Sequence, residues 1–264
     1  MRIDAIATLV PLSLALLPLS VLAAEPEPAP PAPPGVVVNV TLASQYISRG
    51  FRQGWGKPAL QGGADYAHPS GWSVGTWMST VSNRFIENGT LEVDLYGGYS
   101  GTTAGGVGYS ALVYYYVYPG AEYKATATTY NYGELSLGTT WKAFYAKYNY
   151  TYTPEFFGIT HARGTGYLDI GANLDLGSGM TLLLHAGNGR VAGDGNNVWN
   201  WNDAKIGISK AYSGGWTAIA ALTKAFPKTD IYDNYTLGIP NSNGVIESSN
   251  PAKATLVLSI TKTF

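Results

Sequence analysis

Residues 36–46 read Val-Val-Val-Asn-Val-Thr-Leu-Ala-Ser-Gln-Tyr. Every second residue from Val36 to Leu42 is apolar, whereas Asn39 belongs to the other, more polar set. Tyr46 also belongs to the apolar set, because it lies an even number of residues after Leu42. Because successive side chains of a β-strand point to opposite faces, this repeat predicts a strand with one apolar and one polar face.

The same two-residue repeat recurs along the chain as far as its last residue. No segment of comparable length shows the 3.6-residue repeat of a helix. Short turns alternate with longer connections, which is typical of an up-and-down antiparallel barrel with short turns at one end and long loops at the other. The expected fold is therefore all-β, an up-and-down antiparallel β-barrel of about twelve strands. The segments lie roughly at 36–47, 58–68, 71–81, 90–100, 107–118, 132–141, 143–153, 166–176, 180–188, 201–211, 215–225 and 253–264.

Composition indicates where the apolar faces lie. Charged residues make up 12% and hydrophobic residues 45% of the 264 residues, whereas a soluble domain carries about 25% charged residues. The polar sets are rich in Ser, Thr, Asn and Gly, which suit a crowded interior better than a solubilising coat. A membrane barrel turns its apolar set toward lipid, so we expect a transmembrane β-barrel. The alternative, a secreted soluble sandwich or lectin, is disfavoured by the low charge.

The N-terminal residues indicate export from the cytoplasm. Residues 1–24 have one early Arg, a long apolar run and a Val-Leu-Ala-Ala ending, which predict a secretory signal peptide cleaved near Ala23 or Ala24. Pro11 and Pro18 disfavour the alternative of an uncleaved anchor helix.

The remaining chain divides into a linker and a barrel. Residues 25–34 read EPEPAPPAPP, which predicts an extended periplasmic linker, and residues 35–264 form the predicted barrel. The last segment, 256–264, alternates and closes on Phe264, with Lys262 as a departure from its apolar set. This ending resembles the C-terminal signal of bacterial outer-membrane barrels. The resemblance implies a bacterial outer-membrane location and recognition of Phe264 by the barrel-assembly machinery.

Aromatic residues gather at the strand ends, as in the two girdles of a membrane barrel. Trp201 lies toward the long connections in the same pattern. These side chains predict contact with outer-membrane lipids. The expected interface residues are Trp72, Tyr99, Tyr150, Tyr152, Trp216 and Phe264.

The polar sets predict the residues that line the lumen, and Trp77 falls among them. Carboxylates outnumber basic residues there, which favours cations in a narrow pore. The alternative is that the charges pair across the lumen and fill it. The 27-residue connection 226–252 is long enough to narrow the mouth. The predicted pore-lining residues are Asn39, Asp65, Glu92, Asp94, Lys147, Asn149, Asp169, Asn173, His185, Asp203 and Lys205.

Several motifs resemble the TorF-type porin family of bacteria. They include VTLASQYISRG at 40–50, GKPALQGGADYAH at 56–68 and EVDLYGGY at 92–99. The resemblance is dense from about 38 to 116 and looser afterwards, where strand order and the terminal Phe carry it. It implies an outer-membrane barrel, and it implies channel activity only at the level of the fold.

We therefore expect a porin-like channel for small hydrophilic solutes, with a mild preference for cations. The first alternative is a sealed structural or adhesive barrel, in which large inward residues such as Tyr96 and Tyr114 meet across the axis. The second is an outer-membrane hydrolase. His68 lies in a short turn, His161 lies in a long loop, and His185 has no Ser or Asp at a signature spacing. No enzyme activity and no catalytic residue is therefore expected. No cofactor, metal or nucleic-acid partner is expected either.

Overall fold

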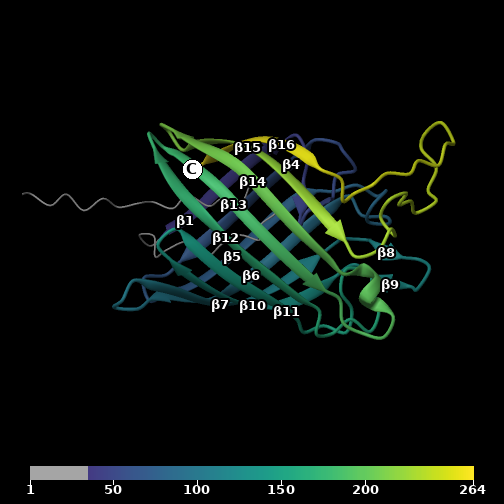
Figure 1. Ribbon diagram of the computed structural model, residues 1–264, viewed down its shortest axis with the longest axis horizontal. Helices are drawn as coiled ribbons and strands as arrows, with labels where there is room; N and C mark the ends of the chain where they lie inside the picture. Colours follow the sequence, from purple (N-terminus) through teal and green to yellow (C-terminus); the bar gives the residue numbers. More distant parts are fainter. Residues whose placement is uncertain (1–34) are drawn as a thin grey trace, which may run out of the picture.

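Twelve long antiparallel strands within residues 35–264, the part of the chain that the structure describes, close into a barrel (Figure 1). The structure is a computed structural model, and it confirms the predicted fold class. The interpretations of residues 1–24 and 25–34 lie outside the described residues. The barrel strands are β1 (Gly35–Ala43), β4 (Ala59–Ala67), β5 (Trp72–Thr80), β6 (Leu91–Thr102), β7 (Val107–Val117), β10 (Tyr132–Trp141), β11 (Phe144–Thr151), β12 (Gly166–Gly177), β13 (Met180–Arg190), β14 (Trp201–Tyr212), β15 (Trp216–Pro227) and β16 (Thr255–Thr263).

Each barrel strand pairs with its neighbours in the chain, and the first and last strands close the ring. Closure between β1 and β16 runs from Asn39 opposite Thr263 to Ala43 opposite Ser259. Within residues 35–264, no helix is long and apolar enough to cross a membrane. The short elements outside the barrel wall are β2 (Ile47–Ser48), β3 (Phe51–Arg52), β8 (Glu122–Tyr123), β9 (Thr128–Thr129) and the 3-10 helix η1 (Asn196–Trp199).

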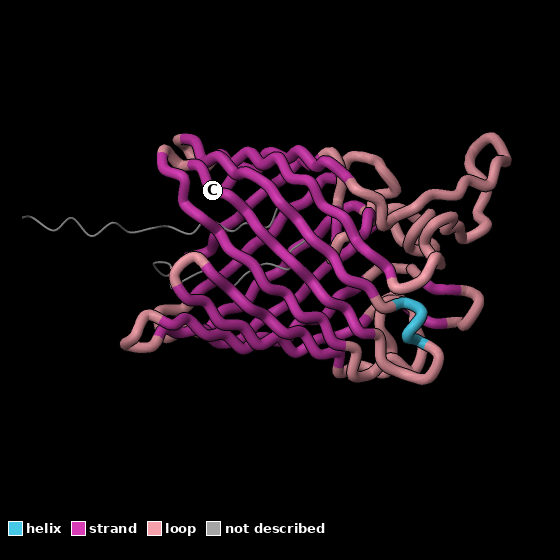
Figure 2. The backbone as a smooth tube through the Cα atoms, viewed as in Figure 1, coloured by secondary structure: helices cyan, strands magenta, loops and turns pink. Residues whose placement is uncertain are grey.

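The connections define two different rims, which Figure 2 shows at opposite ends of the barrel. At the short-turn rim the chain reverses within a few residues, as between Trp141 and Phe144. At the long-loop rim six longer connections leave the wall, and the 228–254 connection extends furthest from it (Figure 1). The long-loop connections are 44–58, 81–90, 118–131, 152–165, 191–200 and 228–254.

The two faces of the wall differ in polarity, as the two-residue repeat predicts. On β16, Leu256 and Leu258 are 60% and 53% exposed on the outer face, whereas Val257 and Thr261 are buried inside. Trp77 of β5 also points inward and is buried. Exposed aliphatic side chains surround the whole barrel, so the outer face requires apolar surroundings to remove this area from water.

All six predicted interface aromatics lie on the outer face, near the strand ends. Trp72 packs edge-on against Tyr99 at 5.5 Å between ring centroids, close to the short-turn rim. Tyr150 and Tyr152 are exposed near the long-loop rim. Trp201 is different, because it points inward and is buried. Its two-residue spacing from the inward Asp203 already places it on the lumen side.

The predicted first strand is too long. β1 ends at Ala43 rather than 47, and Tyr46 is buried inside instead of lying on the apolar outer face. Ser44 explains the change of direction. Its N–H donates to Leu258 O at 2.8 Å, and its Oγ accepts from Leu258 N–H at 3.0 Å. These bonds end the β1–β16 ladder, and the chain then turns away from the wall.

Candidate functional site in the barrel lumen

The 44–58 connection folds into the barrel instead of standing on its rim. Within it, β2 and β3 pair as a hairpin, with Ile47 opposite Arg52 and Ser48 opposite Phe51. Arg49 and Gly50 make its two-residue turn, with φ of 47° and 86°. Positive φ at both central positions is typical of a tight hairpin turn. We call residues 47–52 the lumen hairpin.

One side of the lumen hairpin packs on apolar wall residues. Ile47 is 3% exposed and belongs to a buried cluster with inward side chains of β13, β15 and β16. Phe51 lies 5.6 Å from Trp201 of β14, between ring centroids. The apolar partners of Ile47 are Leu183, Ile219, Ala221 and Val257.

The residue before the hairpin reaches the other side of the barrel. The ring of Tyr46 lies 5.3 Å from that of Trp77 on β5, and its hydroxyl donates to Glu92 Oε1 at 3.1 Å. Burial, reinforced by the carboxylates of Glu92 and Asp94, raises the pKa of Tyr46 well above its usual value. The phenol therefore stays protonated and donates. Since β5 and β13 stand six positions apart in the twelve-strand ring, residues 46–51 cross the lumen.

The hairpin tip touches the wall so closely that it requires glycine. A Cβ on Gly50 would lie 2.6 Å from Cβ of Asp203 and 2.9 Å from Cβ of Ala225. The positive φ at Gly50 independently disfavours a side chain.

Arg49, the other tip residue, is held by the wall through its guanidinium group. Nη1 donates to Glu134 Oε1 at 3.0 Å, and Nη2 donates to Oε2 at 2.5 Å. The guanidinium carbon also lies 4.5 Å from the ring centroid of Tyr167. Glu134 is fully buried, so this ion pair is shielded from water. Arg49 is not among the residues predicted to line the lumen, although it lies in the VTLASQYISRG motif at 40–50.

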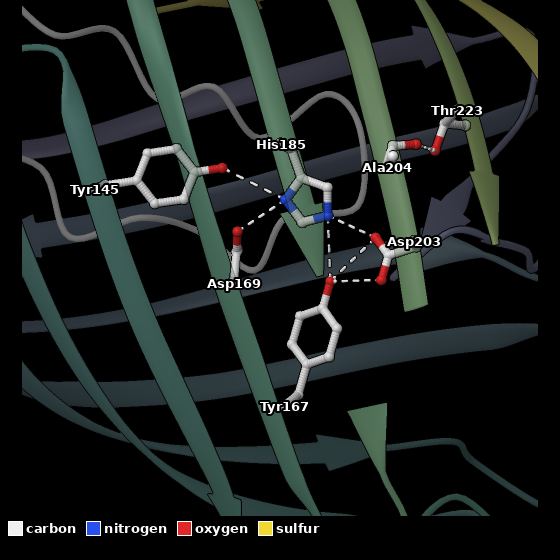
Figure 3. Close-up of polar contacts among 7 residues, drawn as sticks. All are labelled: Tyr145, Tyr167, Asp169, His185, Asp203, Ala204 and Thr223. Atoms are coloured by element: carbon white, nitrogen blue, oxygen red, sulfur yellow. Dashed lines mark hydrogen bonds and ion pairs between the residues drawn. The ribbon is translucent and has the colours of Figure 1, made fainter. Parts of the chain in front are cut away.

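A second polar cluster lies beside this contact, on β11 to β14 (Figure 3). Nδ1 of His185 is 2.8 Å from Asp169 Oδ1, and Nε2 is 2.5 Å from Asp203 Oδ1. The hydroxyl of Tyr167 donates to Asp203 at 3.1 and 3.2 Å. Two flanking carboxylates suit a ring that donates at both nitrogens. The hydrogen bonds drawn in Figure 3 join His185 to two carboxylates and two phenol hydroxyls, which fix the orientation of its ring. None of the bonds drawn joins the ring to a Ser, Thr or Cys nucleophile.

Aromatic side chains cover the wall on β6, β7 and β10. Ring centroids are 5.3 Å apart between Tyr96 and Tyr114, 6.0 Å between Tyr114 and Tyr116, and 4.4 Å between Tyr116 and Tyr132. These strands are neighbours, so the rings stack along one wall. A lumen sealed by wall residues alone requires that such rings meet across the barrel axis, and these four rings do not. The lumen hairpin lies between opposite walls instead, with Ile47 on β13, β15 and β16 and Arg49 on β10.

The connection 228–254 lies over the hairpin at the mouth. Tyr232 is 4.7 Å from Phe51, and Tyr235 is 6.3 Å from Trp55, between ring centroids. Arg52 donates to Ser249 Oγ at 2.5 Å. Burial raises the pKa of Tyr232 and Tyr235 and lowers that of Arg52. The predicted narrowing of the mouth thus involves two segments, of which 44–58 lies deeper.

The predicted pore-lining residues all belong to the inward set of their strands. Asp65 accepts a hydrogen bond from Tyr96 at 2.5 Å. Exposure within this set rises toward the short-turn rim, and the lumen is therefore packed at the hairpin and more open beyond it. Asp65, Lys147, Asn173, His185 and Lys205 are partly exposed, and Asn39, Glu92, Asp94, Asn149, Asp169 and Asp203 are buried.

We expect Tyr46→Phe to lower the free energy of unfolding by about 1.5–3 kcal/mol, because a buried hydrogen bond to a carboxylate is lost. Urea unfolding of the barrel in lipid vesicles measures this change. Tyr66→Phe on the exposed outer face is the matched control, with little expected effect. Equal losses in both variants would contradict the assigned contact.

Comparisons with known proteins agree with this architecture. A family model described as "Bacterial protein of unknown function (Gcw_chp)" matches residues 27–264. This family is not the TorF-type porin family by name, so that part of the resemblance stays a prediction. No curated protein sequence matches the chain.

The similar solved structures include porins. The "KdgM porin" has a TM-score of 0.53 at 6% identity, covering 86% of this chain and 99% of that one. A second structure, "KdgM porin in complex with disordered oligogalacturonate", has a TM-score of 0.52 at 6% identity, with the same coverage. At these identities the similarity shows the fold alone.

Proposed function

The chain belongs to the bacterial Gcw_chp family of unknown function, and we propose that it is a porin-like channel of the outer membrane. It admits small hydrophilic solutes by passive passage. The observation that carries this proposal is a closed barrel with an apolar outer belt and an inner wall that carries charged and polar side chains beside aromatic and aliphatic ones. Channels for passive diffusion across the outer membrane are usually membrane barrels with a polar lumen.

The signal peptide and the terminal strand support the location and orientation. The signal is removed near Ala23 or Ala24, and the Pro-rich segment 25–34 and the short-turn rim face the periplasm. The long-loop rim faces outward, as in other barrels of this kind. The exposed outer face contacts membrane lipid, and Phe264 provides the contact for the barrel-assembly machinery.

The lumen hairpin is the constriction of this channel. It lies between the long-loop mouth and the more open short-turn half, and its contacts reach opposite walls, through Ile47 to β16 and through Arg49 to β10. Its apolar and ionic contacts hold it in place, so conduction requires its displacement. The channel is therefore mostly closed and opens when the hairpin leaves the lumen.

A mild preference for cations follows from the uneven charge of the wall. Asp65, Glu92 and Asp94 lie on β4 and β6, and β4 to β6 contain no basic residue. Lys147 and Lys205 stand on the far side, where Asp169 and Asp203 offset them. The net carboxylate excess attracts cations to the lumen.

Asp65→Asn is expected to lower the cation-over-anion permeability ratio about five- to thirtyfold. One unit charge about 4–8 Å away attracts a cation and repels an anion by about 0.5–1 kcal/mol each in water, which is a difference of about 1–2 kcal/mol between the two ions. The reversal potential of the refolded barrel under a KCl gradient measures the ratio. Asp230→Asn in the 228–254 connection is the control. A ratio unchanged by Asp65→Asn would contradict the proposed charge selectivity.

The burial of inward residues such as Glu134 and Asn149 favours one other candidate, a sealed structural or adhesive barrel. This candidate predicts no current even after the hairpin is removed, which separates the two functions. We propose no enzymatic role, and esterase and protease assays with His185→Ala as a control test this point.

A further inference from the structure

Arg49 sits in a wall pocket whose chemistry matches a guanidinium group. Both of its terminal nitrogens face both oxygens of Glu134, which is the parallel, two-bond arrangement of planar ions. The face of Tyr167 covers the group at 4.5 Å. A carboxylate fork beside an aromatic face is a recognition site for this cation.

The wall holds this pocket in shape without help from the hairpin. Tyr116 donates to Glu134 Oε2 at 3.3 Å, and Thr151 donates to Oε1 at 3.4 Å. The hydroxyl of Tyr167 is fixed by Asp203, a residue of β14. Glu134, Tyr116, Thr151 and Tyr167 all belong to barrel strands, whereas Arg49 belongs to a loop. The pocket therefore remains when the loop moves.

We propose that Glu134 and Tyr167 form a binding site for guanidinium cations, which Arg49 occupies in the closed barrel and from which a soluble guanidinium-bearing solute displaces it. This site latches the lumen hairpin, and competition for it releases the hairpin. The consequence for conduction rests on the proposed channel function, whereas the binding itself does not. Arginine-like solutes are the chemical class that the site selects.

The site discriminates by shape as well as by charge. A planar guanidinium group offers parallel N–H donors that match the two oxygens of Glu134, whereas an ammonium ion acts as a point charge. A quaternary ammonium ion has no N–H donor at all. Methylguanidinium is therefore the probe, and tetramethylammonium at the same concentration is the matched control for charge and ionic strength.

The first experiment measures binding by thermal unfolding in detergent micelles. Arg49→Ala is expected to lower the unfolding midpoint, and methylguanidinium at ten times its dissociation constant raises it again by about 3–5 °C. Tetramethylammonium gives no rise. Arg163→Ala, which removes an exposed loop arginine, shows neither the loss nor the rescue. Arg49→Ala combined with Glu134→Gln loses the rescue.

Equal responses to both cations, or rescue that persists without the Glu134 carboxylate, would overturn the proposed site. Should Arg49→Ala fail to fold, Arg49→Lys provides the test, because it keeps the charge and lacks the fork. Its midpoint also rises with methylguanidinium if the site exists, and an unchanged midpoint overturns it.

The second experiment measures current through the natural barrel. Methylguanidinium is expected to increase the open fraction several-fold, and tetramethylammonium is not. Rescue in micelles without current in any variant would refute the channel and leave the site in place. Currents that respond equally to both cations would refute the latch and leave the channel in place.

Discussion

Replacement of residues 47–52 by a flexible Gly-Ser segment of equal length is expected to raise the mean current through the barrel about a hundredfold. Release of the hairpin leaves Glu134 buried without Arg49, and breaking a buried ion pair costs about 3–5 kcal/mol. A cost of about 3 kcal/mol leaves the open state populated at about 1%. Planar-bilayer recording at fixed voltage measures the change.

The matched control for this replacement is the same Gly-Ser segment in place of residues 241–246, which are mostly exposed near the tip of the 228–254 connection. We expect that variant to conduct like the natural chain. Equal currents from the two replacements would mean that the hairpin does not obstruct the lumen.

Leu258→Arg is expected to cost about 2–4 kcal/mol of unfolding free energy in lipid vesicles, because a charge on the lipid face near the bilayer centre loses its hydration. Leu258 lies mid-strand on β16 and is exposed on the outer face. Urea unfolding of the vesicle-bound barrel measures the loss.

Val245→Arg, in the exposed part of the 228–254 connection, is the control for this charge. It is expected to change stability by less than about 0.5 kcal/mol, as surface substitutions usually do. A small effect of Leu258→Arg in vesicles would contradict the membrane placement of the outer face.

The repeat of two residues predicts most of the wall because side-chain alternation is a local property of a strand. Asp203 and Trp77 are placed inward by their position in the count alone, and Trp201 could have been placed so by its spacing from Asp203. Each strand continues until a turn ends it, so the strand ranges are also close to those observed. The short turns are also predicted, because each is marked locally by the residues between two strands.

The lumen hairpin was not predicted, because distant contacts determine its position. Arg49 meets Glu134, which lies 85 residues further along the chain, and Ile47 packs on β13, β15 and β16. Tyr46 keeps the alternation of the first strand although the strand ends at Ala43. The available signal was Arg49-Gly50 between two short β-forming pairs, which indicates a hairpin turn but not its location.

We propose that this barrel is a channel that the lumen hairpin closes, and single-channel recording of the refolded natural chain beside the 47–52 replacement tests this proposal. We expect brief, rare openings in the natural chain and long openings of the same or larger size in the variant. A flat baseline in both proteins would show a sealed barrel and contradict the proposed channel.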